Sequence, residues 1–263
     1  MSLFNFGKNK VSNMGTGTSN NVGNTSGGTV SNGVDSVNSS AKVTLTKAEA
    51  GLERHLVSLK KEKGVDLFKH RARVVVVIDR SGSMSGRYRD GSVQDTLTRL
   101  LPLGLRFDDN GEIEVYSFED GCTQLESMSV KNFENYVKKE MSRLPYGGTR
   151  YAPVLKQLIK DYNDGSAFPT FVIFITDGAN SDPSETDRVI RESAKKKYKL
   201  FVQFVGIGNE SFSYLRKLDD LSGREADNTA FLKVQEFSRL SDDELYARLL
   251  EQYIPWLREL GLS

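Results

Sequence analysis

The stretch Val74-Val75-Val76-Val77-Ile78, followed at once by Asp79-Arg80-Ser81-Gly82-Ser83, decides the fold of this chain. A continuous β-branched apolar run of this kind is typical of a strand that is buried on both faces, as in a parallel sheet. The polar residues and the glycine that follow end the strand.

The same pattern returns further along the chain and predicts four more strands, at residues 112–118, 171–175, 200–205 and 230–234. Helical spacing of apolar residues fills the gaps at 92–106 and 152–162. Asp182 and Pro183 indicate a further helix start, with a carboxylate N-cap and proline at the first position. Ser241 opens a capping box for the last helix, and Pro255 is expected to kink that helix or end its regular part.

The first 69 residues differ from the rest. In residues 1–40, Gly, Ser, Asn and Thr fill 27 positions, so we expect a disordered tail that cannot bury enough apolar surface to fold. Residues 41–69 are predicted to form an extension, with a short strand at 42–45 and a helix that carries Leu52, Leu56 and Leu59 on one face. Residues 70–263 then form the main domain.

Strands that alternate with helices indicate an α/β fold, with a doubly wound, mostly parallel central sheet and helices on both faces. In such sheets, ligands bind at the carboxyl ends of the strands. The functional residues are therefore expected just after Ile78 and just after Ile175.

Composition excludes several classes of protein. One Cys and two His are too few for a disulfide scaffold or a tetrahedral zinc site. The 36 basic and 35 acidic residues give a net charge of only +1, which argues against a basic surface for a nucleic-acid partner. No apolar run is long enough to span a bilayer, and the N-terminus lacks the apolar region of a signal peptide, so we expect a cytoplasmic protein.

Five oxygen-bearing side chains stand at the predicted strand ends and in the loop between them. They are Asp79, Ser81, Ser83, Thr149 and Asp177. Two carboxylates close together in a cleft repel each other, and a divalent cation removes that conflict. Oxygen ligands with few carboxylates suit Mg²⁺, although Mn²⁺ and Ca²⁺ tolerate the same ligands.

Asp-x-Ser-x-Ser after a strand, a later Thr in a Gly-Gly-Thr loop and Thr-Asp-Gly after the next central strand resemble the von Willebrand factor A domain over residues 70–235. In that family this set is the metal-ion-dependent adhesion site. The resemblance implies direct ligation by Ser81, Ser83 and Thr149, with Asp79 and Asp177 acting mainly through water. It also implies that a protein partner supplies an acidic residue to the metal.

The sequence around these motifs is similar to that of bacterial cytoplasmic A domains linked to tellurium resistance and chemical-stress operons. This implies a binding module in a stress-response complex. Arg80, Met84 and Arg150 flank the motif and are predicted to form the rim that a partner contacts. The sequence does not decide whether the two arginines point toward the ion or away from it, and it leaves the oligomeric state open.

Two other functions compete with a binding module. A metal-dependent phosphatase or phosphoryl-transfer enzyme would use Asp79 as its nucleophile. The acid usual in such enzymes two residues further on is replaced by Ser81. A dinucleotide-binding domain would need Gly-x-Gly-x-x-Gly after the first strand, and that motif is absent. We therefore predict that the protein is not an enzyme.

Overall fold

The computed structural model describes residues 32–178 and 180–262. These residues form a six-stranded sheet in the order β3-β2-β1-β4-β5-β6. The strands are β1 (Arg73–Asp79), β2 (Glu114–Phe118), β3 (Cys122–Gln124), β4 (Thr170–Thr176), β5 (Leu200–Ile207) and β6 (Thr229–Val234). All neighbouring pairs are parallel except β2 and β3. The predicted doubly wound, mostly parallel sheet is confirmed.

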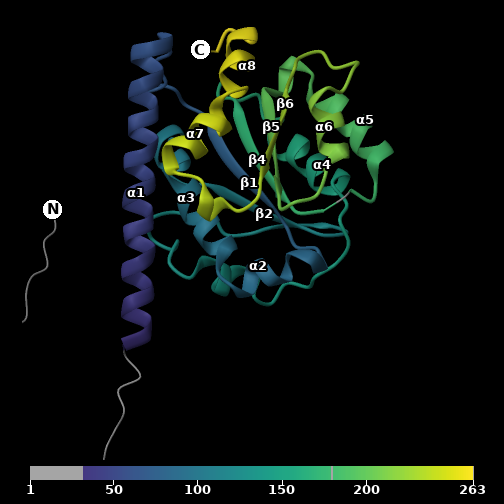
Figure 1. Ribbon diagram of the computed structural model, residues 1–263. Helices are drawn as coiled ribbons and strands as arrows, with labels where there is room; N and C mark the ends of the chain where they lie inside the picture. Colours follow the sequence, from purple (N-terminus) through teal and green to yellow (C-terminus); the bar gives the residue numbers. More distant parts are fainter. Residues whose placement is uncertain (1–31, 179, 263) are drawn as a thin grey trace, which may run out of the picture.

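Helices cover both faces of this sheet (Figure 1). They are α1 (Asn32–Lys63), α2 (Ser85–Arg89), α3 (Ser92–Phe107), α4 (Ala152–Asp161), α5 (Pro183–Ser193), α6 (Ser213–Asp219), α7 (Asp242–Leu250) and α8 (Tyr253–Glu259). Successive strand residues point to opposite faces. Val76 and Ile78 therefore join the apolar core under α1, α3, α7 and α8, while Val75 and Val77 join the core under α4, α5 and α6.

The five predicted strands are all present, and the structure adds β3, a three-residue antiparallel edge strand. Such a short, polar segment carries no apolar alternation that a sequence pattern would reveal. The strand predicted at residues 42–45 is wrong, because these residues belong to α1. Leu45 and Leu52 are buried and Val43 is half exposed, so the helical spacing of the apolar face extends back through this segment.

Residues 1–31 of the predicted tail lie outside the described residues, and α1 begins at Asn32, within the range predicted for the tail. Leu52, Leu56 and Leu59 are buried on one face of α1, as expected, and they pack in the same core as the sheet. The extension is thus part of the core. None of the helices in the described ranges is long and apolar enough to cross a membrane.

The C-terminal segment bends as predicted at Pro255, but the break precedes the proline. Helix α7 ends at Leu250 and α8 begins at Tyr253. The proline ring clashes with the carbonyl of the residue four positions earlier, which is Glu251. The capping serine is confirmed, since Ser241 Oγ accepts a hydrogen bond from the backbone N–H of Glu244 at 3.2 Å.

Candidate metal centre at the carboxyl ends of β1 and β4

The predicted site lies where the chain order of the sheet reverses, between β1 and β4. These two strands are parallel neighbours, with Ile78 opposite Ile175. The residues that follow them, Asp79 and Thr176-Asp177, therefore leave the sheet side by side. The crevice at such a switch point is the usual binding position in this class of fold.

Asp79 is fully buried at the end of β1. One carboxylate oxygen accepts a hydrogen bond from the Ser81 N–H at 2.6 Å, and the other accepts one from the Thr176 hydroxyl at 2.6 Å. Burial raises the pKa of Asp79 to about 6, against the opposing effect of these hydrogen bonds. The nearby charge of Asp177 raises it slightly further. A buried carboxylate with only neutral donors is a group that a nearby cation would stabilise.

Ser81, Ser83 and Asp177 form a chain of oxygen atoms beside it. The two serine Oγ atoms are 3.0 Å apart, and Ser83 Oγ donates to Asp177 Oδ1 at 2.8 Å. Two adjacent ligands of an octahedral Mg²⁺ at about 2.1 Å lie about 3.0 Å from each other. The spacing of the two hydroxyls therefore fits the donor set of such an ion.

The loop that carries Thr149 is tied to the serine loop through its backbone. Gly82 N donates to Gly147 O, and Gly147 N donates to Arg80 O, each at 3.3 Å. The hydroxyl of Thr149 lies 3.8 Å from the position that a Cβ on Gly178 would occupy. Thr149 thus lies beside the Asp177-Gly178 turn. The structure brings all five predicted residues to the same edge of the sheet.

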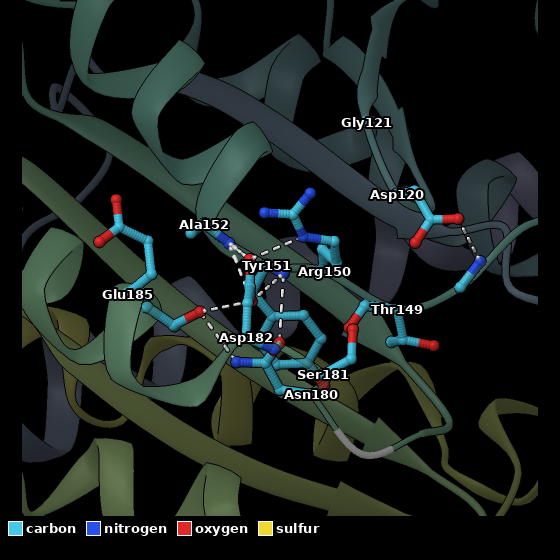
Figure 2. A network of polar contacts seen from close by, with 12 residues as sticks. Asp120, Gly121, Thr149, Arg150, Tyr151, Ala152, Asn180, Ser181, Asp182 and Glu185 are labelled. Atoms are coloured by element: carbon cyan, nitrogen blue, oxygen red, sulfur yellow. Dashed lines mark hydrogen bonds and ion pairs between the residues drawn. The ribbon is translucent and has the colours of Figure 1, made fainter.

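A polar network holds this loop from the side of α4 and α5 (Figure 2). The carbonyl of Thr149 accepts hydrogen bonds from both the N–H and the hydroxyl of Ser181, at 2.8 Å each. The carboxylate of Asp182 accepts from Tyr151 N at 3.0 Å and from Ala152 N at 3.3 Å. It also pairs with Arg150 Nε at 3.5 Å.

Asp182 therefore differs from its predicted role. Pro183 does begin α5 with Asp182 before it, as the sequence indicates, but the Asp182 side chain makes no capping hydrogen bond to its own helix. Its carboxylate instead caps the N-terminus of α4, the helix that follows Thr149. The sequence shows the capping residue but not which of two nearby helix ends it serves.

Two of the three predicted rim residues are buried, which corrects that prediction. Arg80 is 3% exposed, and its guanidinium lies between the rings of Tyr88 and Tyr146, 4.7 and 4.3 Å from their centroids. It donates to the carbonyl of Leu144 at 2.7 Å. Met84 is fully buried in the core.

The physical reason is packing. The rings of Tyr88 and Tyr146 hold the Arg80 guanidinium inside the protein, and the short 3-10 helix Gly82–Met84 carries Met84 into the core. Of the predicted rim, Arg150 remains at the surface, with its side chain 48% exposed. Tyr146, which is 42% exposed, takes the place of Arg80 there.

Sequence reasoning missed three residues that support the site. Thr176 holds Asp79, and the Tyr151 hydroxyl lies 3.3 Å from the Thr176 hydroxyl. Asp120 accepts a hydrogen bond from Gly148 N at 3.0 Å. A Cβ on Gly148 would collide with the Asp120 carboxylate. Thr176 belongs to the Thr-Asp-Gly motif, so the sequence could have indicated its role. Asp120 lies in a turn with no recognisable pattern.

The ligand chemistry of the site is dominated by hydroxyl groups. Within the described ranges, no group of three or more His, Cys, Asp or Glu side chains is arranged to hold a metal. The predicted ligand set combines three hydroxyl groups with two carboxylates, and oxygen donors of this kind favour a hard divalent cation. The five residues remain a predicted ligand set.

Comparison with known proteins identifies relatives of this chain. The family vWA-TerF-like, described as the vWA found in the TerF C terminus, matches residues 71–262. The protein YcbR of Bacillus subtilis (strain 168) is 39% identical over 218 residues, which cover 81% of this chain and 88% of YcbR.

Solved structures share the fold at low identity. A von Willebrand factor type A protein from Catenulispora acidiphila aligns with a TM-score of 0.51 and 19% identity over 69% of this chain, which spans only 43% of that protein. The manganese-loaded TRAP protein of Plasmodium vivax aligns with a TM-score of 0.50 and 18% identity, over 70% of this chain and 74% of TRAP. With its sheet order, its motifs and the family match over residues 71–262, this chain belongs to the vWA-TerF-like family of von Willebrand factor A domains.

Proposed function

We propose that this domain is a binding module that recruits a protein partner through a divalent cation. Ser81, Ser83 and Thr149 would hold the ion, with Asp79 and Asp177 behind them. A bound cation supplies a positive centre that attracts an acidic side chain of the partner. The observation that carries the proposal is the 3.0 Å spacing of the serine hydroxyls next to the buried carboxylate of Asp79.

The protein's own residues prepare this site. Thr176 and the Ser81 N–H fix both oxygens of Asp79, so the buried charge is held in one orientation. Asp120 and Ser181 fix the backbone on either side of Thr149. Such outer contacts orient the ligands of a metal and change its affinity when they are removed.

We propose Mg²⁺ as the ion, with Mn²⁺ and Ca²⁺ as competitors for the same oxygen ligands. That the TRAP protein of the same fold is manganese-loaded supports a divalent cation in this class of site. The match to the domain found in TerF supports the further proposal that the module acts in a bacterial tellurium-resistance or stress-response complex. A cytoplasmic location belongs to the same proposal.

A phosphatase that uses Asp79 as nucleophile is opposed by the geometry. A nucleophilic carboxylate must reach the substrate. Asp79 is fully buried, and both of its oxygens already accept hydrogen bonds. We therefore propose binding without catalysis.

Calorimetric titration of Mg²⁺ tests the metal site. We expect saturable heats from the wild type and a loss of at least about tenfold in affinity for Ser83→Ala and for Thr149→Ala, which remove proposed ligands. Ser85→Ala is the matched control, since it removes a hydroxyl just beyond the set and should bind as the wild type does. Equal heats from the wild type and Asp79→Ala would falsify the proposal.

Co-purification of partner proteins tests the proposal that a partner binds through the metal. Proteins that co-purify with the wild type in Mg²⁺ should be lost with a chelator and lost again with Thr149→Ala. Partners that survive both treatments would show that binding does not pass through the metal.

A further inference from the structure

A hollow lies far from the candidate metal centre, between α1 and the α7–α8 segment. It has a volume of about 510 Å³. His55, Leu59 and Lys63 of α1 form one wall, and residues of α7 and α8 form the other. In Figure 1 this part of α1 lies beside α8, at the end of the molecule opposite α2, which follows the serine loop. Because α1 precedes residues 71–262, the family match does not include this wall.

The floor of the hollow is apolar. Leu59, Val65, Leu250 and Ile254 line it and join the main core, and Pro255 adds a further apolar surface. Side chains of this kind hold an aliphatic group well, since burying apolar surface stabilises a complex by about 25 cal/mol for each Å² removed from water. The floor is thus suited to a hydrocarbon chain.

The rim of the hollow is positively charged. Lys63, Arg248 and Arg258 line it against one carboxylate, that of Glu251. Arg248 is already paired with Glu244. Neither Lys63 nor Arg258 forms an ion pair with any residue in the described ranges. Glu251 offsets one of these two cations, so the rim keeps a net positive charge beside an apolar floor. This combination favours a ligand that is apolar at one end and anionic at the other.

His55 also lines the hollow. Its Nε2 atom is buried and has no hydrogen-bond partner among the described residues, so it reaches a ligand in the hollow when the ring turns toward it. Buried polar atoms without a partner are rare in folded proteins. In the neutral tautomer with a proton on Nε2, this nitrogen donates to an acceptor such as a carboxylate oxygen.

We propose that this hollow binds an amphipathic carboxylate, with its aliphatic chain on the floor and its carboxylate toward Lys63, Arg258 and His55. Its volume lies in the range of pockets for small molecules, about 300–1,000 Å³. A specific protein interface instead buries about 800 Å² of a broad surface on each partner. This proposal does not depend on the metal site.

Titration with decanoate below its micelle concentration, followed by calorimetry and by Trp256 fluorescence, tests the proposal. Trp256 is the only tryptophan of the chain and adjoins Pro255 in the wall of the hollow. We expect one saturable site for decanoate. Decanol, which lacks the charge, should bind about tenfold more weakly, and decyltrimethylammonium should not compete.

Lys63→Glu and Arg258→Glu should each weaken decanoate binding at least about tenfold, because they replace an attracting charge with a repelling one. Lys61→Glu, on the same turn of α1 but outside the hollow, is the matched control and should bind as the wild type does. Urea unfolding should be unchanged in all three variants, which shows that they are folded.

Three results would overturn the proposal. The first is equal affinity of the hollow for decanoate and for decyltrimethylammonium, and the second is equal decanoate binding by Lys63→Glu and Lys61→Glu. The third is that this protein binds an acidic amphipathic peptide but no decanoate. The last result would identify the hollow as a protein-docking groove.

Discussion

Replacing Arg80 with methionine distinguishes a residue that a partner contacts from one that holds the site together. Methionine keeps the length and apolar packing of the side chain but removes its charge and its hydrogen bonds. Arg80 is 3% exposed, lies 4.7 and 4.3 Å from the ring centroids of Tyr88 and Tyr146, and donates to Leu144 O at 2.7 Å. Each of these contacts would be lost.

The expected loss of stability in Arg80→Met follows from these contacts. Each cation–π pair contributes about 0.5–2 kcal/mol, and a hydrogen bond from a charged donor contributes about 1.5–3 kcal/mol. These contributions share one guanidinium and do not add fully, so we expect the free energy of unfolding to fall by about 3 kcal/mol. The loop from Leu144 to Thr149 would also lose its anchor. We therefore expect Mg²⁺ affinity to fall about tenfold, although Arg80 is not a proposed ligand.

Urea unfolding and calorimetric Mg²⁺ titration of Arg80→Met measure both effects. Arg150→Met is the matched control: its side chain is 48% exposed and makes one ion pair, at 3.5 Å. A half-exposed pair contributes less than about 1 kcal/mol, so this control should be nearly as stable as the wild type. The reasoning is refuted if Arg80→Met loses less than about 1 kcal/mol and binds Mg²⁺ normally, or if Arg150→Met proves the more damaging change.

Three further predictions concern other parts of the fold. Burial, aided by the charge of Arg71, lowers the pKa of His70 to about 4, so the stabilising contribution of neutral His70 is complete above pH 6.5 and is lost as the pH falls toward 4. Between pH 8 and 5, the free energy of unfolding in urea should fall by about 2 kcal/mol more in the wild type than in His70→Phe. The same pH dependence in both proteins would contradict this. Gly148→Ala should weaken Mg²⁺ binding at little cost in stability, because the new Cβ displaces the exposed Asp120 side chain from the loop; unchanged Mg²⁺ heats would count against that role. Leu56→Ala should cost about 2–5 kcal/mol in thermal or urea unfolding, because Leu56 is 1% exposed in the core, and a cost below about 1 kcal/mol would show that α1 is not part of that core.

The sequence was sufficient to predict the sheet because its central strands are apolar on both faces. Val74 to Ile78 form a short β-branched run that favours a strand buried on both faces, and the alternation of such strands with helices then favours a parallel sheet. The polar residues at each strand end then had to meet, because parallel neighbouring strands end at the same edge. The positions of Ser81, Ser83 and Asp177 follow from that topology, and their contacts confirm that they lie together.

What the sequence did not predict depends on contacts between distant segments. Arg80 follows the same strand as the serines, and only the packing of Tyr88 and Tyr146 against it determines that it points inward. Asp120 is 28 residues from Gly148 in the chain and reaches it because β2 lies beside β1. The segment 42–45 was ambiguous because four residues contain too few apolar positions to separate a period of 2 from one of 3.6.

The two proposed sites lie at opposite ends of the sheet, and this placement separates their chemistry. The metal centre is at the carboxyl end of β1, whereas Val65, in the wall of the hollow, precedes the amino end of the same strand. A strand of seven residues spans about 23 Å, which exceeds the Debye length of about 8 Å at physiological ionic strength. The charge of a bound cation is therefore screened from Lys63 and Arg258. If both proposals hold, an acidic partner at one end and an anionic ligand at the other would occupy the domain together without competing.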